Sequence, residues 1–156
     1  VIAFRRDMEG LAAERAARLA SDTDLEVIAA TFARMEQAKG RANPEREARL
    51  DAEFHMAILE ASHNVVMLHM MRSMFQLMQD GVFYNRKVIF NQSTRRSSLL
   101  DQHRAIRDAI LARDPKAARA AVETHLDFVE RALTDQRKAE AHEHIARQRL
   151  EHENRR

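Results

Sequence analysis

The stretch Leu50-Asp51-Ala52-Glu53-Phe54-His55 places a carboxylate and an imidazole one helical turn apart. Residues four positions apart project from the same face of an α-helix, so these two side chains can bind one ion together. Two more histidines, His103 and His125, lie further along the chain in segments that also have apolar residues at helical spacing. Three helices that direct these side chains inward would form a metal site inside a helical bundle.

The composition is that of a single all-α domain. The chain has 156 residues, of which 45% are hydrophobic, and it contains only three glycines and two prolines. It has no cysteine, which excludes disulfides and thiolate metal sites. No apolar run has membrane-spanning length and no secretory leader is visible, so we expect a cytoplasmic protein without a membrane partner.

The charges do not indicate a nucleic-acid interface. The net charge is +2, and the segment Arg137 to Arg156 accounts for it with six basic and four acidic residues. No stripe of lysine and arginine with interleaved aromatic residues stands out in the rest of the chain. Most of these charges are therefore interpreted as a solvated helical surface.

Start and stop signals divide the chain into helices. Asn43-Pro44 and Asp114-Pro115 each place a capping side chain before a proline at the first helical position. Ser21 and Asn64 can cap two further helices, and Gly40 is expected to end one in a left-handed conformation. Together with the apolar spacing, these signals predict helices over approximately residues 1–20, 21–39, 43–62, 64–81, 94–113 and 114–135.

Two segments leave alternatives open. Residues 82–93 indicate either a further helix or a short connector. Residues 136–156 have few apolar anchors and form either a protruding charged helix or a frayed end. The predicted fold is an all-α antiparallel bundle of six or seven helices with a central pocket for a metal and an effector.

The candidate metal ligands are Asp51, His55, His103 and His125. Three imidazoles and one carboxylate suit Zn²⁺, which is our first choice, as well as Ni²⁺, Mn²⁺ or Fe²⁺. Four protein ligands can close a tetrahedral zinc site, whereas a six-coordinate metal would keep two positions for water or a carboxylate ligand. Alternatively, the four residues are buried and merely hydrogen-bonded to one another.

Arg5 is the candidate partner for the charge of a bound carboxylate. It lies among apolar neighbours on the first helix, and arginine pairs with carboxylates in a bidentate geometry. The alternative is that Arg5 is a surface residue equivalent to its neighbour Arg6.

Catalytic alternatives fit the sequence less well. A di-iron bundle needs two Glu-x-x-His motifs, and the single match, Glu60 to His63, falls at a helix end. A metal-dependent hydrolase or lyase would use the same four ligands but needs a general base, and Glu53 points away from the ligand face. A purely structural dimerisation module also remains possible. We expect the chain not to be an enzyme.

Three parts of the sequence resemble the C-terminal effector-binding domain, called FCD, of FadR-type GntR transcription regulators. The central signature of that domain resembles the string from Asp51 to Asn64, and its opening helix resembles the segment from Arg5 to Ala13. The segments 102–110 and 114–126 are similar to its closing helices. The resemblance covers about residues 1–135 and includes all four candidate ligands in order.

The resemblance implies an all-α domain, residues 1–135, that senses a small organic acid next to a divalent metal. Carried over by position, Asp51, His55, His103 and His125 would hold the metal, Arg5 would bind the effector carboxylate and Asn64 would line the pocket. The string from His63 to Arg72 is most similar to the branch that senses pyruvate, lactate or glycolate. The family also implies a homodimer that binds DNA through an N-terminal winged helix-turn-helix, which this chain lacks. Residues 136–156 would be a charged extension outside the family core.

Overall fold

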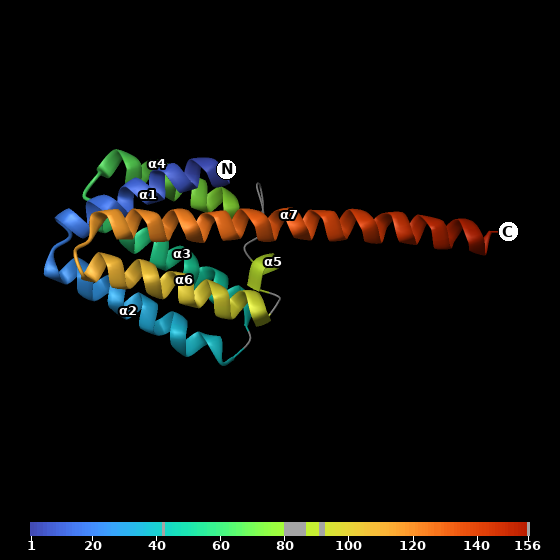
Figure 1. The fold of residues 1–156 in the computed structure, drawn as a ribbon, viewed down its shortest axis with the longest axis horizontal. Helices are drawn as coiled ribbons and strands as arrows, with labels where there is room; N and C mark the ends of the chain where they lie inside the picture. Colours follow the sequence, from blue (N-terminus) through green and yellow to red (C-terminus); the bar gives the residue numbers. More distant parts are fainter. Residues whose placement is uncertain (42, 80–86, 91–92, 156) are drawn as a thin grey trace.

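The computed structural model describes residues 1–41, 43–79, 87–90 and 93–155, and these residues form helices and no strands. The predicted all-α bundle is confirmed, with six long helices and one short one (Figure 1). In chain order, the helices are α1 (Ile2–Leu19), α2 (Asp22–Lys39), α3 (Pro44–Ala61), α4 (Val65–Gln79), α5 (Lys87–Phe90), α6 (Ser93–Leu111) and α7 (Pro115–Asn154).

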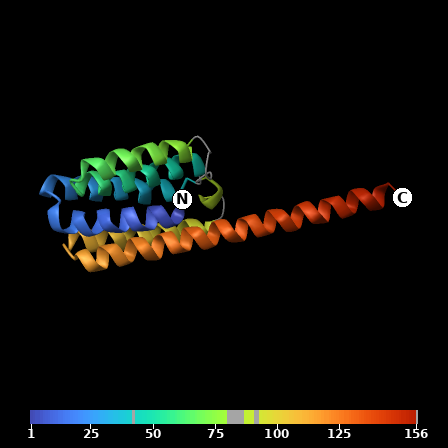
Figure 2. The ribbon, with the colours of Figure 1, turned by 90° about the horizontal axis from the view of Figure 1, so that it is seen from above.

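The long helices lie side by side along one axis, and α7 runs out of the bundle at one end (Figures 1 and 2). Helix α1 packs against α7 and α3, α2 packs against α3 and α6, and α4 packs on α3. The buried face of α1 includes Ala12, Ala13, Ala16 and Ala17, whose small side chains allow neighbouring helices to approach closely. Large apolar side chains fill the centre of the bundle: Phe32, Phe54, Ile106 and Leu126 are fully buried.

The predicted caps start four of these helices, and Asn64 is the one at the start of α4. The Ser21 side chain accepts a hydrogen bond from the Asp24 amide, and the Asp24 carboxylate accepts one from the Ser21 amide, which completes a capping box. Asn43 and Asp114 cap α3 and α7, each directly before the predicted proline. Each of these caps contributes about 1 kcal/mol to helix stability, and together they fix where α2, α3, α4 and α7 begin.

One predicted helix end has a different conformation. Gly40 ends α2 but has a φ of −74°, which is right-handed rather than left-handed. Among the described non-glycine residues, those with a left-handed conformation are instead His63 and Arg113, with φ of 53° and 56°. Their side chains make contacts that glycine could not make, since His63 pairs with Asp24 at 2.7 Å and Arg113 reaches the Ala17 carbonyl at 3.5 Å.

Helix α7 does not end near residue 135. It continues to Asn154, and residues 137–155 are exposed, so of the two alternatives for this segment the structure shows the protruding helix. No glycine or proline interrupts the helix after Pro115. Pairs one turn apart, such as Glu143 with Arg147 at 3.3 Å, support its exposed part.

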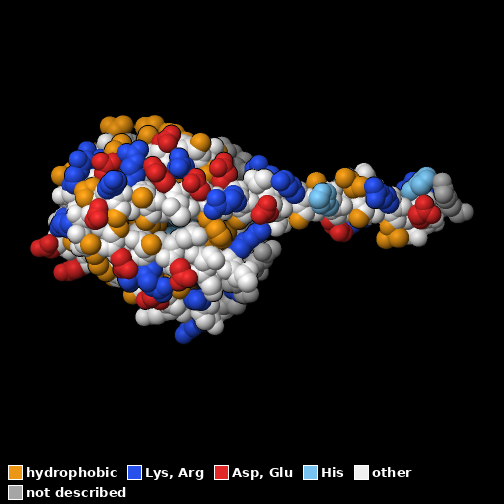
Figure 3. All heavy atoms as spheres, in the orientation of Figure 1, with side chains coloured by type: hydrophobic (Ala, Val, Ile, Leu, Met, Phe, Trp, Pro, Cys, Tyr) orange, Lys and Arg blue, Asp and Glu red, His pale blue; other side chains and the backbone are white. Residues whose placement is uncertain are grey.

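Of residues 82–93, the structure describes α5 and Ser93 at the start of α6. The remainder of that segment and the predicted end of α4 near Gly81 lie outside the described residues. Within the described residues, no helix combines the length and the apolar character needed to cross a lipid bilayer. On the face shown in Figure 3, acidic and basic side chains are intermixed rather than gathered in one stripe.

Candidate metal centre

The four predicted ligands converge in the middle of the bundle. Asp51 and His55 come from α3, His103 from α6 and His125 from α7, and each offers a donor atom within 4.8 Å of the others. We call these four residues the Asp–His cluster. All four are buried, with exposed fractions of 6% for Asp51 and at most 2% for the histidines. The four side chains are therefore almost completely removed from contact with bulk water.

Three of the four donor atoms have the spacing of ligands around one ion, and the donor atom of His125 lies within 4.8 Å of them. Asp51 Oδ1 lies 2.9 Å from His103 Nε2 and 3.5 Å from His55 Nε2, and the two Nε2 atoms are 3.2 Å apart. Ligand atoms that each lie about 2.0–2.2 Å from a zinc ion stand roughly 3–3.5 Å apart. Two imidazole nitrogens and a carboxylate oxygen that face each other need a proton or a cation between them. The residues present therefore fit a divalent metal.

Two further side chains orient the imidazoles. His55 Nδ1 donates to Glu9 Oε2 at 2.6 Å, and His125 Nδ1 donates to Gln102 Oε1 at 2.9 Å. With the proton on Nδ1, the lone pair of each ring lies on Nε2, which is the nitrogen that a metal would bind. Outer hydrogen bonds of this kind are typical of metal-binding histidines.

Burial is the main reason that the pKa values of two histidines in the cluster are lowered. Burial lowers the pKa of His103, with Asp51 acting in the opposite direction. Burial, followed by the nearby His103 and His55, holds the pKa of His125 well below its ordinary value. Burial also lowers the pKa of His55, but the charges of Glu9 and Asp51 outweigh this and raise it.

Glu9 remains ionised although it is buried. Burial alone would raise its pKa, but the charges of Arg5 and then His55 lower it to about 2. Arg5 binds it through two nitrogens, with Nε 2.6 Å from Oε1 and Nη2 3.3 Å from Oε2. The buried Glu9 carboxylate thus links Arg5 to the Asp–His cluster through His55.

Arg5 is not the surface arginine of the alternative interpretation. It is 2% exposed, and its guanidinium lies 5.3 Å from the centre of the Phe75 ring. Its neighbour Arg6 instead forms a surface ion pair with Asp127 at 2.9 Å. Arg5 lines a cavity of about 10 Å³ together with Asp51 and His125. This volume is close to the minimum that one water molecule requires.

The other two residues singled out from the sequence lie elsewhere. Asn64 caps α4 by accepting a hydrogen bond from the Met67 amide at 3.0 Å, and it is not among the residues that line the cavity beside Arg5. Its role as a pocket residue stays a prediction. Glu53 forms a surface ion pair with Arg34 at 2.6 Å, so it points away from the cluster, as its spacing from Asp51 predicts.

Two residues of the site, Glu9 and Gln102, are not among those predicted from the sequence. Glu9 had a detectable signal, because it stands one turn after Arg5 and can pair with it. Gln102 precedes His103 in sequence but binds His125 on another helix. No local pattern indicates that contact, since it depends on how α6 and α7 pack.

Taken together, the fold and the site define a class of protein: an all-α bundle with one aspartate and three histidines buried between three of its helices. The FCD domain family matches residues 1–128 of this chain. The chain belongs to this family, the FCD domain of GntR-type transcription regulators, and the resemblance seen in its sequence is confirmed.

Several transcription regulators are similar to the chain over most of its length. It is 36% identical over 129 residues to the "Putative L-lactate dehydrogenase operon regulatory protein" of Escherichia coli K12, covering 83% of this chain and 48% of that protein. It is 33% identical over 132 residues to the Glc operon transcriptional activator of the same organism, covering 82% and 52%. These relatives are regulators and not enzymes.

A solved structure supports the fold. Streptococcus agalactiae GntR aligns with a TM-score of 0.63 at 27% identity, covering 83% of this chain and 56% of that one. The chain spans about half the length of the curated relatives it matches.

Proposed function

We propose that this chain is the effector-sensing domain of a cytoplasmic bacterial transcription regulator. It binds a small 2-hydroxy- or 2-oxo-carboxylate at a divalent metal held by Asp51, His55, His103 and His125. The observation that carries the proposal is the buried Asp–His cluster with Arg5 beside it. The names of two relatives, which refer to lactate dehydrogenase and Glc operons, support a small organic acid of the lactate, glycolate or pyruvate class.

Different residues of this chain would bind the metal and the acid. The metal, zinc as first choice or nickel, manganese or iron, would supply a Lewis acid for the acid's carboxylate and adjacent oxygen. Arg5 pairs with the carboxylate, because Arg5 lines the same cavity as Asp51 and His125. The closely packed helices around the cluster keep water out, which strengthens both interactions.

Regulation follows from movement of the helices that line the site. The cluster joins α3, α6 and α7, and Arg5 adds α1, so a bound acid contacts elements from most of the chain. If the acid binds one arrangement of a homodimer better than another, it shifts the balance between them. A coupling of about 1–3 kcal/mol changes affinity by several-fold to hundredfold. DNA binding would reside in a winged helix-turn-helix outside this chain.

Substitution of His103 and Arg5 tests the proposal. His103→Ala is expected to lose most of the metal, measured by elemental analysis, while the helical spectrum remains. Arg5→Ala and Arg5→Lys are both expected to bind lactate or glycolate roughly tenfold or more weakly in calorimetry, because a charged bidentate pair is lost. Arg5→Lys should keep the metal, whereas Arg5→Ala also leaves the buried Glu9 carboxylate without its cationic partner. The lysine variant keeps a positive charge beside Glu9, which guards against misfolding.

Arg6→Ala is the matched control, since Arg6 is the adjacent arginine but pairs on the surface with Asp127. It should bind acid as the unmodified protein does. Unchanged metal content in His103→Ala would remove His103 from the site. Unchanged acid affinity in both Arg5 variants would mean that another group neutralises the carboxylate.

A further inference from the structure

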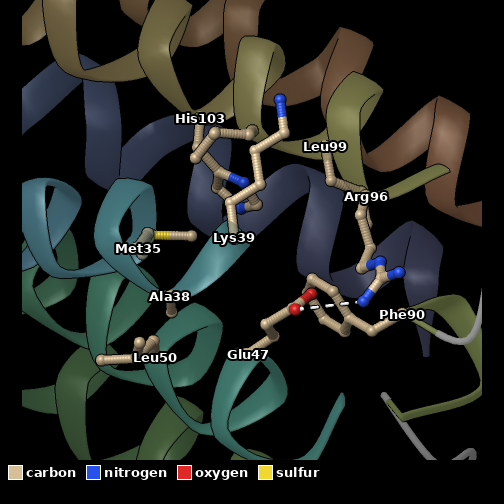
Figure 4. Close-up of a pocket in the computed structure, with 10 residues that line it drawn as sticks. Met35, Ala38, Lys39, Glu47, Leu50, Phe90, Arg96, Leu99 and His103 are labelled. Carbon is tan, nitrogen blue, oxygen red and sulfur yellow. Dashed lines mark hydrogen bonds and ion pairs between the residues drawn. The ribbon is translucent and has the colours of Figure 1, made fainter. Parts of the chain in front are cut away.

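Two cavities adjoin the Asp–His cluster. The inner cavity, of about 10 Å³, contains Arg5, Asp51 and His125 in its lining. The outer cavity, of about 20 Å³, has His103 in its lining (Figure 4). Phe90 of α5 and Leu99 of α6 line both cavities, so these two side chains form a wall between them.

The inner cavity has no room for a three-carbon acid as it stands. A volume of about 10 Å³ is the space of roughly one water molecule, so the acid has to displace part of the lining. Arg5 is held by Glu9, and Asp51 and His125 belong to the cluster. Ile89 and Val129 line only the inner cavity, whereas Phe90 and Leu99 also line the outer cavity. The wall is therefore where the inner cavity can expand.

The chemistry of the outer cavity matches a hydrocarbon group. Most of its lining residues are apolar, with Met35, Leu50 and Leu100 among them. Its charged residues, Lys39, Glu47 and Arg96, include an ion pair at 3.4 Å between Arg96 Nη1 and Glu47 Oε1 (Figure 4). An acid whose polar end binds at Arg5 and the cluster would direct its carbon substituent towards Phe90 and Leu99.

We propose that Phe90 and Leu99 determine which acids bind, by limiting the length of the apolar substituent on the carbon next to the carboxylate. This inference rests on the proposed function, because it assumes that the acid binds at the Asp–His cluster. With the wall intact, the domain accepts short acids such as glycolate and lactate. With the wall removed, the two cavities merge, and a monocarboxylic 2-hydroxy acid with a longer alkyl chain fits.

Calorimetry on the metal-loaded protein with glycolate, L-lactate and L-2-hydroxyhexanoate tests the proposal. The unmodified domain is expected to bind lactate and to reject 2-hydroxyhexanoate. In Phe90→Ala and Leu99→Ala, the affinity for 2-hydroxyhexanoate relative to lactate should rise about tenfold or more, because several methylene groups become buried. Two variants are used because truncation of either core side chain can cost stability, which a thermal melt monitors.

Two matched controls each enlarge one cavity and leave the wall in place. Leu100→Ala enlarges only the outer cavity, and Ile89→Ala, on the same helix as Phe90, enlarges only the inner one. Neither should admit 2-hydroxyhexanoate. If both wall variants still bind lactate but their affinity for 2-hydroxyhexanoate relative to lactate is unchanged, the role of the wall is overturned. The proposed function is then unaffected. An unmodified, metal-loaded domain that binds none of the acids overturns the proposed function and this inference with it.

Discussion

At the scale of single residues, Glu9 connects the two halves of the site. One of its oxygens accepts a hydrogen bond from His55, and the carboxylate also pairs with Arg5. A carboxylate is costly to bury unless it is paired, so Arg5 and His55 are needed to keep Glu9 ionised inside the bundle. In return, Glu9 fixes the proton of His55 on Nδ1 and leaves Nε2 for the metal.

Glu9→Gln tests this connection. Glutamine has nearly the same shape and can still accept the His55 proton, but it lacks the charge that makes the imidazole a stronger ligand. Metal affinity is expected to fall by about 10–100-fold, measured by competition with a coloured chelator. Glu14→Gln is the control, since Glu14 lies on the same helix and pairs with Arg119 instead. Equal metal affinity in Glu9→Gln and the unmodified protein would show that Glu9 has no orienting role.

Acidification is expected to release the metal, because an imidazole must lose its proton before it can coordinate. The pKa of His55 is raised, so in the metal-free protein this residue holds a second proton at a higher pH than an ordinary histidine. The metal has to displace that proton, and its affinity therefore falls as the pH drops from neutrality. Metal retained after dialysis at pH 7.5, 6 and 5 measures this. Full occupancy at pH 5 would argue against a site dominated by histidines.

At the scale of helices, the sequence predicts what depends on local spacing. The pairs Asn43-Pro44 and Asp114-Pro115 mark helix starts because capping and proline geometry involve only adjacent residues. The Asp51–His55 pair is equally local. Apolar spacing and the resemblance to the FCD domain predict that His103 and His125 join this pair, and the structure brings all four residues together.

Features that depend on packing between helices could not be predicted. The left-handed conformations of His63 and Arg113 accompany contacts with α2 and α1, so no local rule indicates them. The contact between Gln102 and His125 depends on how α6 and α7 are aligned. The wall of Phe90 and Leu99 requires two cavities, which only the packed structure reveals.

Helix α7 offers a test of the domain boundary predicted at residue 135. A chain that ends there retains Val129 and Leu133, the last large buried side chains of α7, and loses only the exposed part of the helix. Its melting temperature should change by less than about 2–4 °C, the shift that about 1 kcal/mol produces in a domain of this size. A chain that ends at residue 128 loses Val129 and Leu133 and should melt far lower. If the chain that ends at residue 135 is much less stable than the full chain, residues 136–156 belong to the folding unit. The predicted boundary would then be wrong.

At the scale of the whole molecule, the Asp–His cluster lies where distant parts of the chain meet. Its ligands come from α3, α6 and α7, and Arg5 and Glu9 add α1, so the site is assembled only when the bundle is complete. A metal that binds the folded state and not the unfolded one stabilises it by mass action, and an acid bound on the metal adds to this. Metal, acid and fold are therefore expected to be thermodynamically linked.

The measurement that tests this account most directly is the metal content of the purified domain, followed by thermal melts with glycolate, lactate and pyruvate, each with and without a chelator. The account predicts about one transition metal ion per chain, and a melting temperature that at least one of these acids raises only while the metal is present. A domain that contains no metal, takes up none when it is supplied and melts at the same temperature with every acid would contradict the metal-dependent sensor. The Asp–His cluster would then be a set of buried hydrogen bonds in a structural module.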